Sequence, residues 1–316
     1  MIGEEYTITR LTDDNMASLI PLYKDAFGQD KTLEQIRAKF DTAFLGMKNL
    51  AFMAVDKQGT VAGFYAVFPF KYTIGGKEMV LAQVGDLMTH SQHRRKGLYI
   101  HLANVTHPVA YAEGVDLIVT FPHVQVMSSY LGFVNRLDFV HTHTLHGYYI
   151  KVNAAPLAFA LNKTGVTKKL YKAYSNFILG LFTDTKTPYV EEVPVSYGEV
   201  ENTAGFVSYK KSYSGSRMVK MKGQLFWVKV SGNVLQVGAI QRISGHNFGD
   251  TLGALKKLAF LLGIRVVQFD TSPGTYWDAE FIKHHQPIDS FKVTILNPKG
   301  LDLADFKFSL GDIDSF

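Results

Sequence analysis

Residues 84–99 read VGDLMTHSQHRRKGLY, and this stretch decides the fold prediction. Its first part is apolar enough for a buried strand that ends near Thr89, and a basic loop then leads into a helix that begins at Leu98. The first amides of a helix have no partner within it and lie at the positive end of its dipole. Such a helix end suits phosphate. The sequence therefore predicts an anion site here, with added attraction from Arg94, Arg95 and Lys96.

The loop carries a recognisable pattern: Gln or Arg, two residues of any type, Gly, one residue of any type, and then Gly or Ala. Arg94-Arg95-Lys96-Gly97-Leu98 fits its first five places, and at these residues the chain resembles the GNAT superfamily of acyl-CoA-dependent N-acyltransferases. Tyr99 departs from the small last residue. The resemblance covers about residues 5–150 and includes Leu131-Gly132-Phe133, which is similar to the triplet that follows the family's last helix. That helix is expected at about residues 124–130.

The resemblance implies that acetyl-CoA, or another acyl-CoA, binds along the strand end and the loop. Backbone groups of Leu87 and Thr89 would contact pantetheine, and the amides of the loop and first helical turn would hold the diphosphate. His123 stands where many relatives have an asparagine near the cofactor arm. The residues predicted to bind the cofactor are Leu87, Met88, Thr89, Arg94, Arg95, Lys96, Gly97, Leu98, Tyr99 and His123.

The resemblance also implies direct transfer to an amine, in which the protein positions the reactants and stabilises charge. Asp86 lies on the motif strand, where family members often place a carboxylate base. With its two-residue period, the strand places Asp86, Met88 and His90 on one face. An aspartate that serves only as a cap or in an ion pair is the alternative for Asp86, and His90 is a second candidate base.

Tyr130 is the candidate acid that protonates the departing thiolate. The family's tyrosine stands four residues before the glycine of the triplet, which is Ser128 here, whereas Tyr130 stands two before it. Two residues rotate a helix by about 200°. A packed aromatic ring is therefore the alternative role for Tyr130.

Phe316 is the third candidate catalytic residue. In some tandem relatives the chain's own terminal carboxylate reaches the active site of the first domain as a base. The aromatic ending suits a docked tail, and an ordinary mobile tail is the alternative.

A faint internal repeat suggests a duplicated fold. Gln83-Val84-Gly85 and Gln236-Val237-Gly238 each lie in a strand that is followed by a loop, a helix, a glycine and another strand. The predicted fold is an α/β protein with mixed sheets, in which two acyltransferase-like domains lie in tandem and the second is degenerate. The loop at residues 244–249 lacks basic residues, so one acyl-CoA site is expected, in the N-terminal half. The predicted domains are 1–152, a helical connector 153–195, and 196–316.

Composition excludes several kinds of chemistry. The 316 residues include no cysteine, which rules out disulfides, thiolate zinc sites and cysteine nucleophiles. The net charge of +5 favours an anionic ligand but is too small and diffuse to predict a nucleic-acid partner. No apolar run approaches the roughly 18 residues of a membrane helix, and residues 1–5 show no secretory signal. Neither membrane insertion nor secretion is expected, and a cytoplasmic location is predicted.

Two further patterns in the sequence, a group of histidines and a basic amphipathic segment, are better explained by structure than by a metal or membrane site. His141 and His143 share a strand face, but His146 does not and no acid completes a metal-binding set, so no metal is predicted. The connector is basic and amphipathic, and we expect its apolar stripe to be buried between two domains, with adsorption to anionic lipid as the alternative. That stripe comprises Leu157, Leu161, Leu170, Tyr174, Ile178 and Leu181.

The sequence thus predicts an acyl-CoA-dependent N-acyltransferase that acetylates a small-molecule amine, with amino sugars and sugar nucleotides as one acceptor class. One alternative is an aminoacyl transferase of the peptidoglycan-bridge type, which also pairs two GNAT-like domains. The other is a non-catalytic module that binds CoA or acts as a scaffold. Acceptor pockets are built from variable loops, so the acceptor itself does not follow from the sequence.

Overall fold

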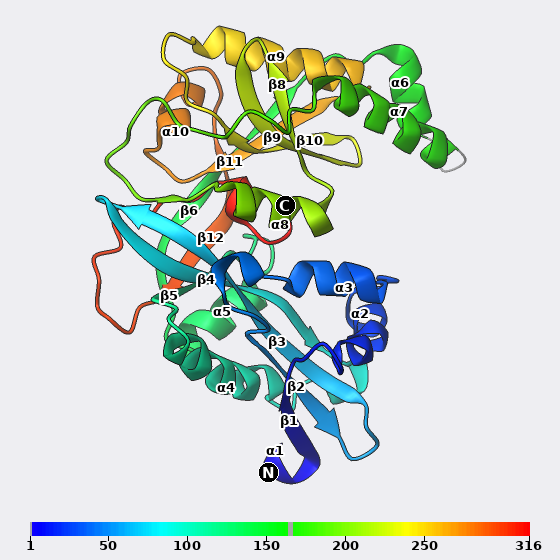
Figure 1. Cartoon of the computed structure of the whole chain (residues 1–316), viewed down its shortest axis with the longest axis vertical. Helices are drawn as coiled ribbons and strands as arrows, with labels where there is room; N and C mark the ends of the chain where they lie inside the picture. The colour runs from blue at the N-terminus through cyan, green and yellow to red at the C-terminus, as the bar shows by residue number, and fades with distance from the viewer. Residues whose placement is uncertain (1, 164–166) are drawn as a thin grey trace. The chain divides into compact units, whose positions relative to one another are not determined.

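The computed structural model describes residues 2–163 and 167–316 (Figure 1). They pack into two compact units, each built from more than one stretch of chain. Unit 1 takes residues 1–142, 205–213 and 292–304, and unit 2 takes residues 143–204, 214–291 and 305–316. The units interleave along the chain, and the consecutive domains at 1–152, 153–195 and 196–316 stay a prediction.

Unit 1 is built on a mixed sheet with the strand order β1-β2-β3-β4-β5-β12. Strands β4 and β5 run parallel, and the other neighbouring pairs run antiparallel. Residues 292–296 of β12 belong to this unit. The strands are β1 Tyr6–Arg10, β2 Ala51–Asp56, β3 Val61–Ile74, β4 Lys77–Thr89, β5 Leu117–Thr120 and β12 Ile288–Leu296.

Helices cover both faces of this sheet. Phe64 and Tyr65 are neighbours on β3 and point to opposite faces, so they belong to different apolar clusters. Tyr65 packs with residues of α4, and Phe64 packs with residues of α2 and α3. The helices of this unit are α1 Ile2–Glu5, α2 Leu19–Phe27, α3 Leu33–Phe40, α4 Leu98–Ala112, α5 Met127–Arg136 and α8 Ala204–Ser214, with 3-10 turns at Met16–Ser18, Ala43–Leu45 and Ser91–His93.

In unit 2 the strands are ordered β6-β11-β10-β9-β8, with β10 parallel to β11 and the other neighbouring pairs antiparallel. The core of this unit lies between these strands and helices α7 and α9. The elements are β6 Val140–Lys151, β7 Glu199–Val200, β8 Arg217–Met221, β9 Gln224–Ser231, β10 Val234–Ile240, β11 Val266–Thr271, α6 Pro156–Lys163, α7 Lys168–Phe182, α9 Phe248–Leu261, α10 Tyr276–Phe281 and a 3-10 turn Leu310–Asp312.

The two sheets share one order of pairing. In each, an antiparallel pair is interrupted by a bulge, which lies just after Gln83-Val84-Gly85 in β4 and at the glycine of Gln236-Val237-Gly238 in β10, and a parallel neighbour follows. The last strand of each sheet comes from the other half of the chain, because β12 pairs with β5 and β6 pairs with β11. The predicted α/β class with mixed sheets is confirmed. A duplication as the origin of this likeness stays a prediction.

The end of α5 corrects one predicted motif. The helix was expected to end before Leu131-Gly132-Phe133, but it runs from Met127 to Arg136 and contains that triplet. The left-handed position that ends the helix is Asp138, with a φ of 57°, and β6 begins two residues later. Leu137-Asp138-Phe139 therefore lies just after the helix, where Leu131-Gly132-Phe133 was expected. Aspartate can take the left-handed position there because it tolerates this conformation better than most residues do.

The apolar stripe of the connector also has a different phase. On α7 the buried residues are Tyr171, Ser175, Ile178 and Leu179. Leu157, Leu170 and Leu181, which were expected to be buried, are exposed. The sequence contains two apolar stripes on this helix, and its period alone did not show which one faces the core.

His107 in α4 makes the stability of the protein depend on pH. It is buried, its Nε2 lies 2.8 Å from the Tyr65 hydroxyl oxygen, and burial lowers its pKa to about 4. An unfolded histidine has a pKa of about 6.5, so the unfolded chain binds more protons between these values and stability falls as the pH drops through them. We predict that the wild type loses about 2 kcal/mol more than His107→Gln between about pH 7 and pH 5. Urea unfolding, monitored by amide hydrogen exchange in α4, measures this difference in stability. Equal losses of stability in both proteins would contradict the prediction.

Candidate active site

An extra residue in β4 shapes the candidate site. Phe64 pairs with Met88 and Ala66 with Gly85, so Tyr65 alone faces both Asp86 and Leu87. Asp86 has a φ of 49°, the left-handed conformation that such a bulge usually gives to glycine. The structure thus holds a carboxylate at the most strained point of this strand.

The bulge also changes the face on which the next residues lie. Val84 packs on the α4 side of the sheet, whereas Asp86 and Met88 lie on the side of α2 and α3. His90 lies on that side too, with its Nε2 3.9 Å from a carboxylate oxygen of Asp25 in α2. The three residues predicted to share a face do so, but on the face opposite to that of Val84.

Beyond the bulge, β4 is open on its β5 side. The parallel pairing joins Leu81–Gln83 to Leu117–Val119, while β4 continues to Thr89. Backbone groups on such an open strand edge can hydrogen-bond to an extended ligand. The open edge contains the predicted pantetheine-binding residues Leu87, Met88 and Thr89.

The loop after this strand forms an anion-binding end for α4. Arg94, Arg95, Lys96 and Gly97 are exposed. Gly97 is the N-cap residue, with a φ of 76° that glycine adopts without strain, and no side chain caps the helix. The amides of the first turn are therefore open to an anionic ligand, and three exposed basic residues precede them in the loop.

Tyr99 does not obstruct this helix end. Its ring packs against Phe133 in α5 at a centroid distance of 5.9 Å, and its buried hydroxyl lies against Gly132. That hydroxyl has no hydrogen-bond partner among the residues the structure describes, and burial raises the pKa of Tyr99 to about 12. Gly132, which was predicted to follow the helix, instead provides room within it for the tyrosine that replaces a small residue.

Asp86 is held by two partners that the sequence did not indicate. The Tyr23 hydroxyl in α2 donates to one carboxylate oxygen, and Lys39 Nζ in α3 donates to the other at 2.7 Å. The side chains of Lys39 and Asp86 are 13% and 8% exposed, so this is a nearly buried ion pair. Tyr23 and Lys39 lie 63 and 47 residues before Asp86, and no local pattern joins them to it.

Tyr130 and His123 lie near the far end of β5. Tyr130 is half-buried in α5, with the His141 ring packed edge-on at 5.8 Å and Lys292 Nζ 4.8 Å from its ring centre. His123 follows β5, the strand that faces the open edge of β4, and its Nδ1 accepts from the Gln125 amide at 3.2 Å.

Comparison with known families gives one match at these residues. Residues 7–139 match the family model described as an acetyltransferase (GNAT) domain. These residues form a GNAT domain. The match includes the bulge, the open edge of β4, the basic loop and α5, whereas a comparison with curated protein sequences found no match.

Solved structures share the fold over nearly the whole chain. A candidate acetyltransferase from Pyrococcus horikoshii is 15% identical, with 97% of this chain and 94% of that one aligned at a TM-score of 0.53. A GCN5-related N-acetyltransferase from Kribbella flavida is 11% identical, with 92% and 70% aligned at 0.54. Another from Sphaerobacter thermophilus is 12% identical, with 95% and 98% aligned at 0.52. At these identities the likeness concerns the fold.

Phe316 is docked within unit 2. Its ring is 1% exposed and packs edge-on against Trp227 at 5.5 Å, close to Gly238 at the bulge of β10. Lys229 Nζ donates to the carbonyl of Ser315 at 2.7 Å. The expected docking of this segment is therefore observed, whereas its catalytic role stays a prediction.

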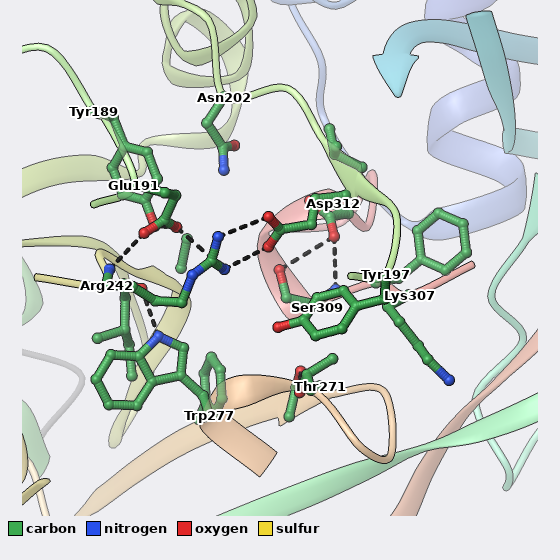
Figure 2. A pocket seen from close by; sticks show the side chains of 17 residues that line it. Tyr189, Glu191, Tyr197, Asn202, Arg242, Thr271, Trp277, Lys307, Ser309 and Asp312 are labelled. Carbon is green, nitrogen blue, oxygen red and sulfur yellow. Dashed lines mark hydrogen bonds and ion pairs between the residues drawn. The ribbon is translucent and has the colours of Figure 1, made fainter. Parts of the chain in front are cut away.

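A pocket of about 60 Å³ lies in unit 2 beyond the ends of β10 and β11 (Figure 2). Arg242, with 5% of its side chain exposed, donates to both carboxylate oxygens of Glu199 at 2.5 and 2.7 Å, and its amide donates to Glu191 at 2.5 Å. Burial raises the pKa of Glu191. These contacts hold residues 191–199 against the end of β10. They also pair the charges of Arg242 and Glu199 with each other, so that these charges are not available to bind a ligand. No anion-binding loop lines the described part of this pocket.

Among residues 2–163 and 167–316, no group of three or more His, Asp or Glu side chains is arranged to hold a metal ion. His143 instead contacts Ser272 and His146 contacts Asp278, at 2.6 and 2.7 Å. No helix in the described part of the chain is both long and apolar enough to cross a membrane.

The ion pair at Asp86 yields a stability prediction. Removing one partner of a buried pair leaves an uncompensated charge and typically costs about 3–5 kcal/mol. We predict that Lys39→Met destabilises the protein by about 3 kcal/mol and that adding Asp86→Asn recovers part of this loss. Lys24→Met, which breaks an exposed pair with Asp30, is the control and should cost less than about 1 kcal/mol. Urea denaturation checks this, and a similar cost for both lysines would refute the buried-pair interpretation.

Proposed function

We propose that this protein is an acyl-CoA-dependent N-acyltransferase that moves an acetyl group to a small-molecule amine while both substrates are bound. The observation that carries the proposal is the uncapped N-terminus of α4, with exposed Arg94 and Arg95, next to the open edge of β4. The GNAT domain at residues 7–139 supports this chemistry. Amino sugars and sugar nucleotides are the acceptor class we propose.

The residues present suit an acyl-CoA, which supplies the activated thioester when bound. A diphosphate would accept hydrogen bonds from the amides of the loop and of Leu98 and Tyr99, and Arg94, Arg95 and Lys96 would offset its charge. An extended pantetheine would lie along the backbone of residues 87–89. His123 would contact the cofactor arm from the end of the facing strand.

The corresponding helix end in unit 2 differs from this anion site, which supports a single acyl-CoA site. The helix that follows the bulge of β10 is α9, and its N-cap residue Asn247 accepts from the Asp250 amide at 2.8 Å. Asp250 places a negative charge in the first turn of that helix. A capped helix end with a carboxylate repels phosphate, so α9 differs from α4 in both respects.

The transfer requires two proton movements. The amine nitrogen forms a bond to the acyl carbon and loses a proton to a base, while the carbon–sulfur bond breaks and the sulfur gains a proton from an acid. Tyr130 is the acid we propose, because it lies on α5, the helix that follows the strand facing the open edge of β4. The protein then contributes mainly positioning and proton transfer.

Asp86 is the first candidate base and the carboxylate at Phe316 is the second. Both oxygens of Asp86 already accept hydrogen bonds, from Tyr23 and Lys39. Each oxygen keeps a second lone pair, so Asp86 can still take a proton directly or through a water. If it does neither, it is a structural ion pair, and the GNAT domain either uses the second base or only binds CoA.

Replacing Gly97 tests the anion site. We predict that Gly97→Val weakens acetyl-CoA binding by at least about tenfold, because a β-branched side chain opposes the left-handed backbone and blocks approach to the amides. Gly28→Val is the matched control, since Gly28 also has a left-handed backbone at a helix end, with a φ of 65°. Isothermal titration calorimetry measures both. Equal affinities for the two variants would reject the site, and no uptake by the wild type would reject the proposal.

Kinetics with a panel of amino sugars separates the candidate catalytic groups. We predict that Asp86→Asn lowers kcat/KM by about 100-fold or more and removes the rise of rate with pH, as expected for loss of a general base. Tyr130→Phe should lower kcat by a similar factor without weakening acetyl-CoA binding. Adding one glycine after Phe316 displaces that carboxylate but keeps the ring. Loss of activity in the extended chain alone would assign the base to Phe316, and binding without transfer would favour a non-catalytic module.

A further inference from the structure

The loop that carries the proposed anion site has an unfavourable backbone. Residues 90–97 join β4 to α4, and Arg95 and Gly97 in this loop have left-handed conformations, with φ of 66° and 76°. This conformation is unfavourable for arginine, so it persists only where surrounding contacts hold the backbone. The shape of the loop therefore depends on contacts with other parts of unit 1.

Asp25 on α2 holds the start of this loop. Its two carboxylate oxygens accept separate hydrogen bonds from Ser91, from the amide at 2.6 Å and from the hydroxyl at 2.7 Å. The bond from the hydroxyl contributes most to lowering the pKa of Asp25, so the carboxylate stays charged at neutral pH. Asp25 lies 66 residues before Ser91, and these bonds therefore tie the loop to a separate element.

His93 holds the middle of the loop against two strands. Its Nδ1 lies 2.9 Å from the hydroxyl oxygen of Tyr6 on β1, and its Nε2 lies 3.5 Å from a carboxylate oxygen of Asp56 on β2. The side chains of His93 and Asp56 are only 15% and 11% exposed. Asp56 is itself fixed, because its other carboxylate oxygen accepts from the amides of Gln58 and Thr60, at 2.9 and 2.8 Å. The partners of His93 thus belong to the sheet and not to the loop.

The two anchors form one connected set of contacts. The His93 amide donates to the His90 carbonyl at 2.8 Å, and the centroids of these two rings are 5.6 Å apart. The Nε2 of His90 lies 3.9 Å from Asp25. The contacts therefore run from α2 through the loop to β1 and β2, and they end just before the basic residues 94–96.

We propose that Asp25 and His93 are positioning residues for acyl-CoA, which hold residues 90–97 in the shape that presents the amides of the loop and of the first turn of α4 to the diphosphate. Both act through the loop, and neither is proposed to contact the reacting atoms. This inference rests on the proposed acyl-CoA site. A loop that is already ordered loses less conformational entropy when the diphosphate binds, so the anchors strengthen binding without a contact of their own.

Calorimetric titration with acetyl-CoA and steady-state kinetics of the full-length protein test the proposal. We expect Asp25→Ala to raise both the Kd and the KM for acetyl-CoA by about tenfold, because the binding-competent loop becomes a minor state, while kcat at saturating acetyl-CoA changes by less than about twofold. His93→Phe should have the same effect. Asp25→Asn keeps an acceptor for the Ser91 amide and should recover most of the affinity. A general loss of folded protein would instead lower kcat and leave KM unchanged.

Asp184→Ala is the matched control for Asp25→Ala. In unit 2, Asp184 accepts from the amide and the hydroxyl of Thr187 at 2.8 and 2.6 Å, so the variant removes the same kind of contact from another loop. Its affinity for acetyl-CoA should equal that of the wild type. An equal loss of affinity in Asp184→Ala and Asp25→Ala would overturn the proposal.

Amide hydrogen exchange without CoA gives a readout that does not depend on transfer. The His93 amide should exchange at least about tenfold faster in Asp25→Ala than in the wild type, because the loop opens more often. Unchanged exchange together with unchanged affinity in Asp25→Ala would overturn the positioning role and leave the acyl-CoA site standing. Absence of acetyl-CoA uptake by the wild type would instead reject the proposed function, and this inference with it.

Discussion

The candidate site depends on one extra residue in one strand. Without the bulge at Asp86 and Leu87, β4 would keep its alternation, and the carboxylate would point toward α4, on the same face as Val84. With it, Asp86 turns to α2 and α3, where Tyr23 and Lys39 hold it. The same strand is unpaired on its β5 side beyond Gln83. The one-residue bulge therefore lies where β4 carries both a buried carboxylate and an open backbone edge. The left-handed conformation of Asp86 has a cost of about 1–2 kcal/mol, which its buried contacts must offset.

The two units show how one strand arrangement can carry different chemistry. Each arrangement has a bulge at the glycine of Gln-Val-Gly or just after it, and a parallel strand beyond it. In unit 1 the following helix begins at an uncapped glycine among basic residues, whereas α9 begins at a capping asparagine followed by an aspartate. In unit 2, Arg242 and its carboxylate partners occupy the end of β10. The strands provide the geometry, and the first residues of the next helix determine whether an anion is attracted.

Local features of the site could be predicted from the sequence, and contacts between distant residues could not. The basic loop and the start of α4 are adjacent in the chain, so their pattern was sufficient. Lys39 and Tyr23 reach Asp86 only through the packing of α2 and α3, which no spacing reveals. The end of α5 was misplaced because Asp138 takes a conformation that usually signals glycine, while Gly132 is needed for Tyr99 instead. On α7, a helical period with two apolar stripes could not identify the buried one.

Each unit pairs strands that lie far apart in the chain. Strand β5 pairs with β12, so residue 120 finds its partner at residue 294, and Thr271 of β11 pairs with His146. Loop closure over such separations costs entropy before the pairing contributes energy, which slows folding relative to sheets made from neighbouring strands. The edge of β5 thus stays unpaired until the second half of the chain is present. Strand exchange makes the completion of the sheet of unit 1 depend on a segment from the second half of the chain.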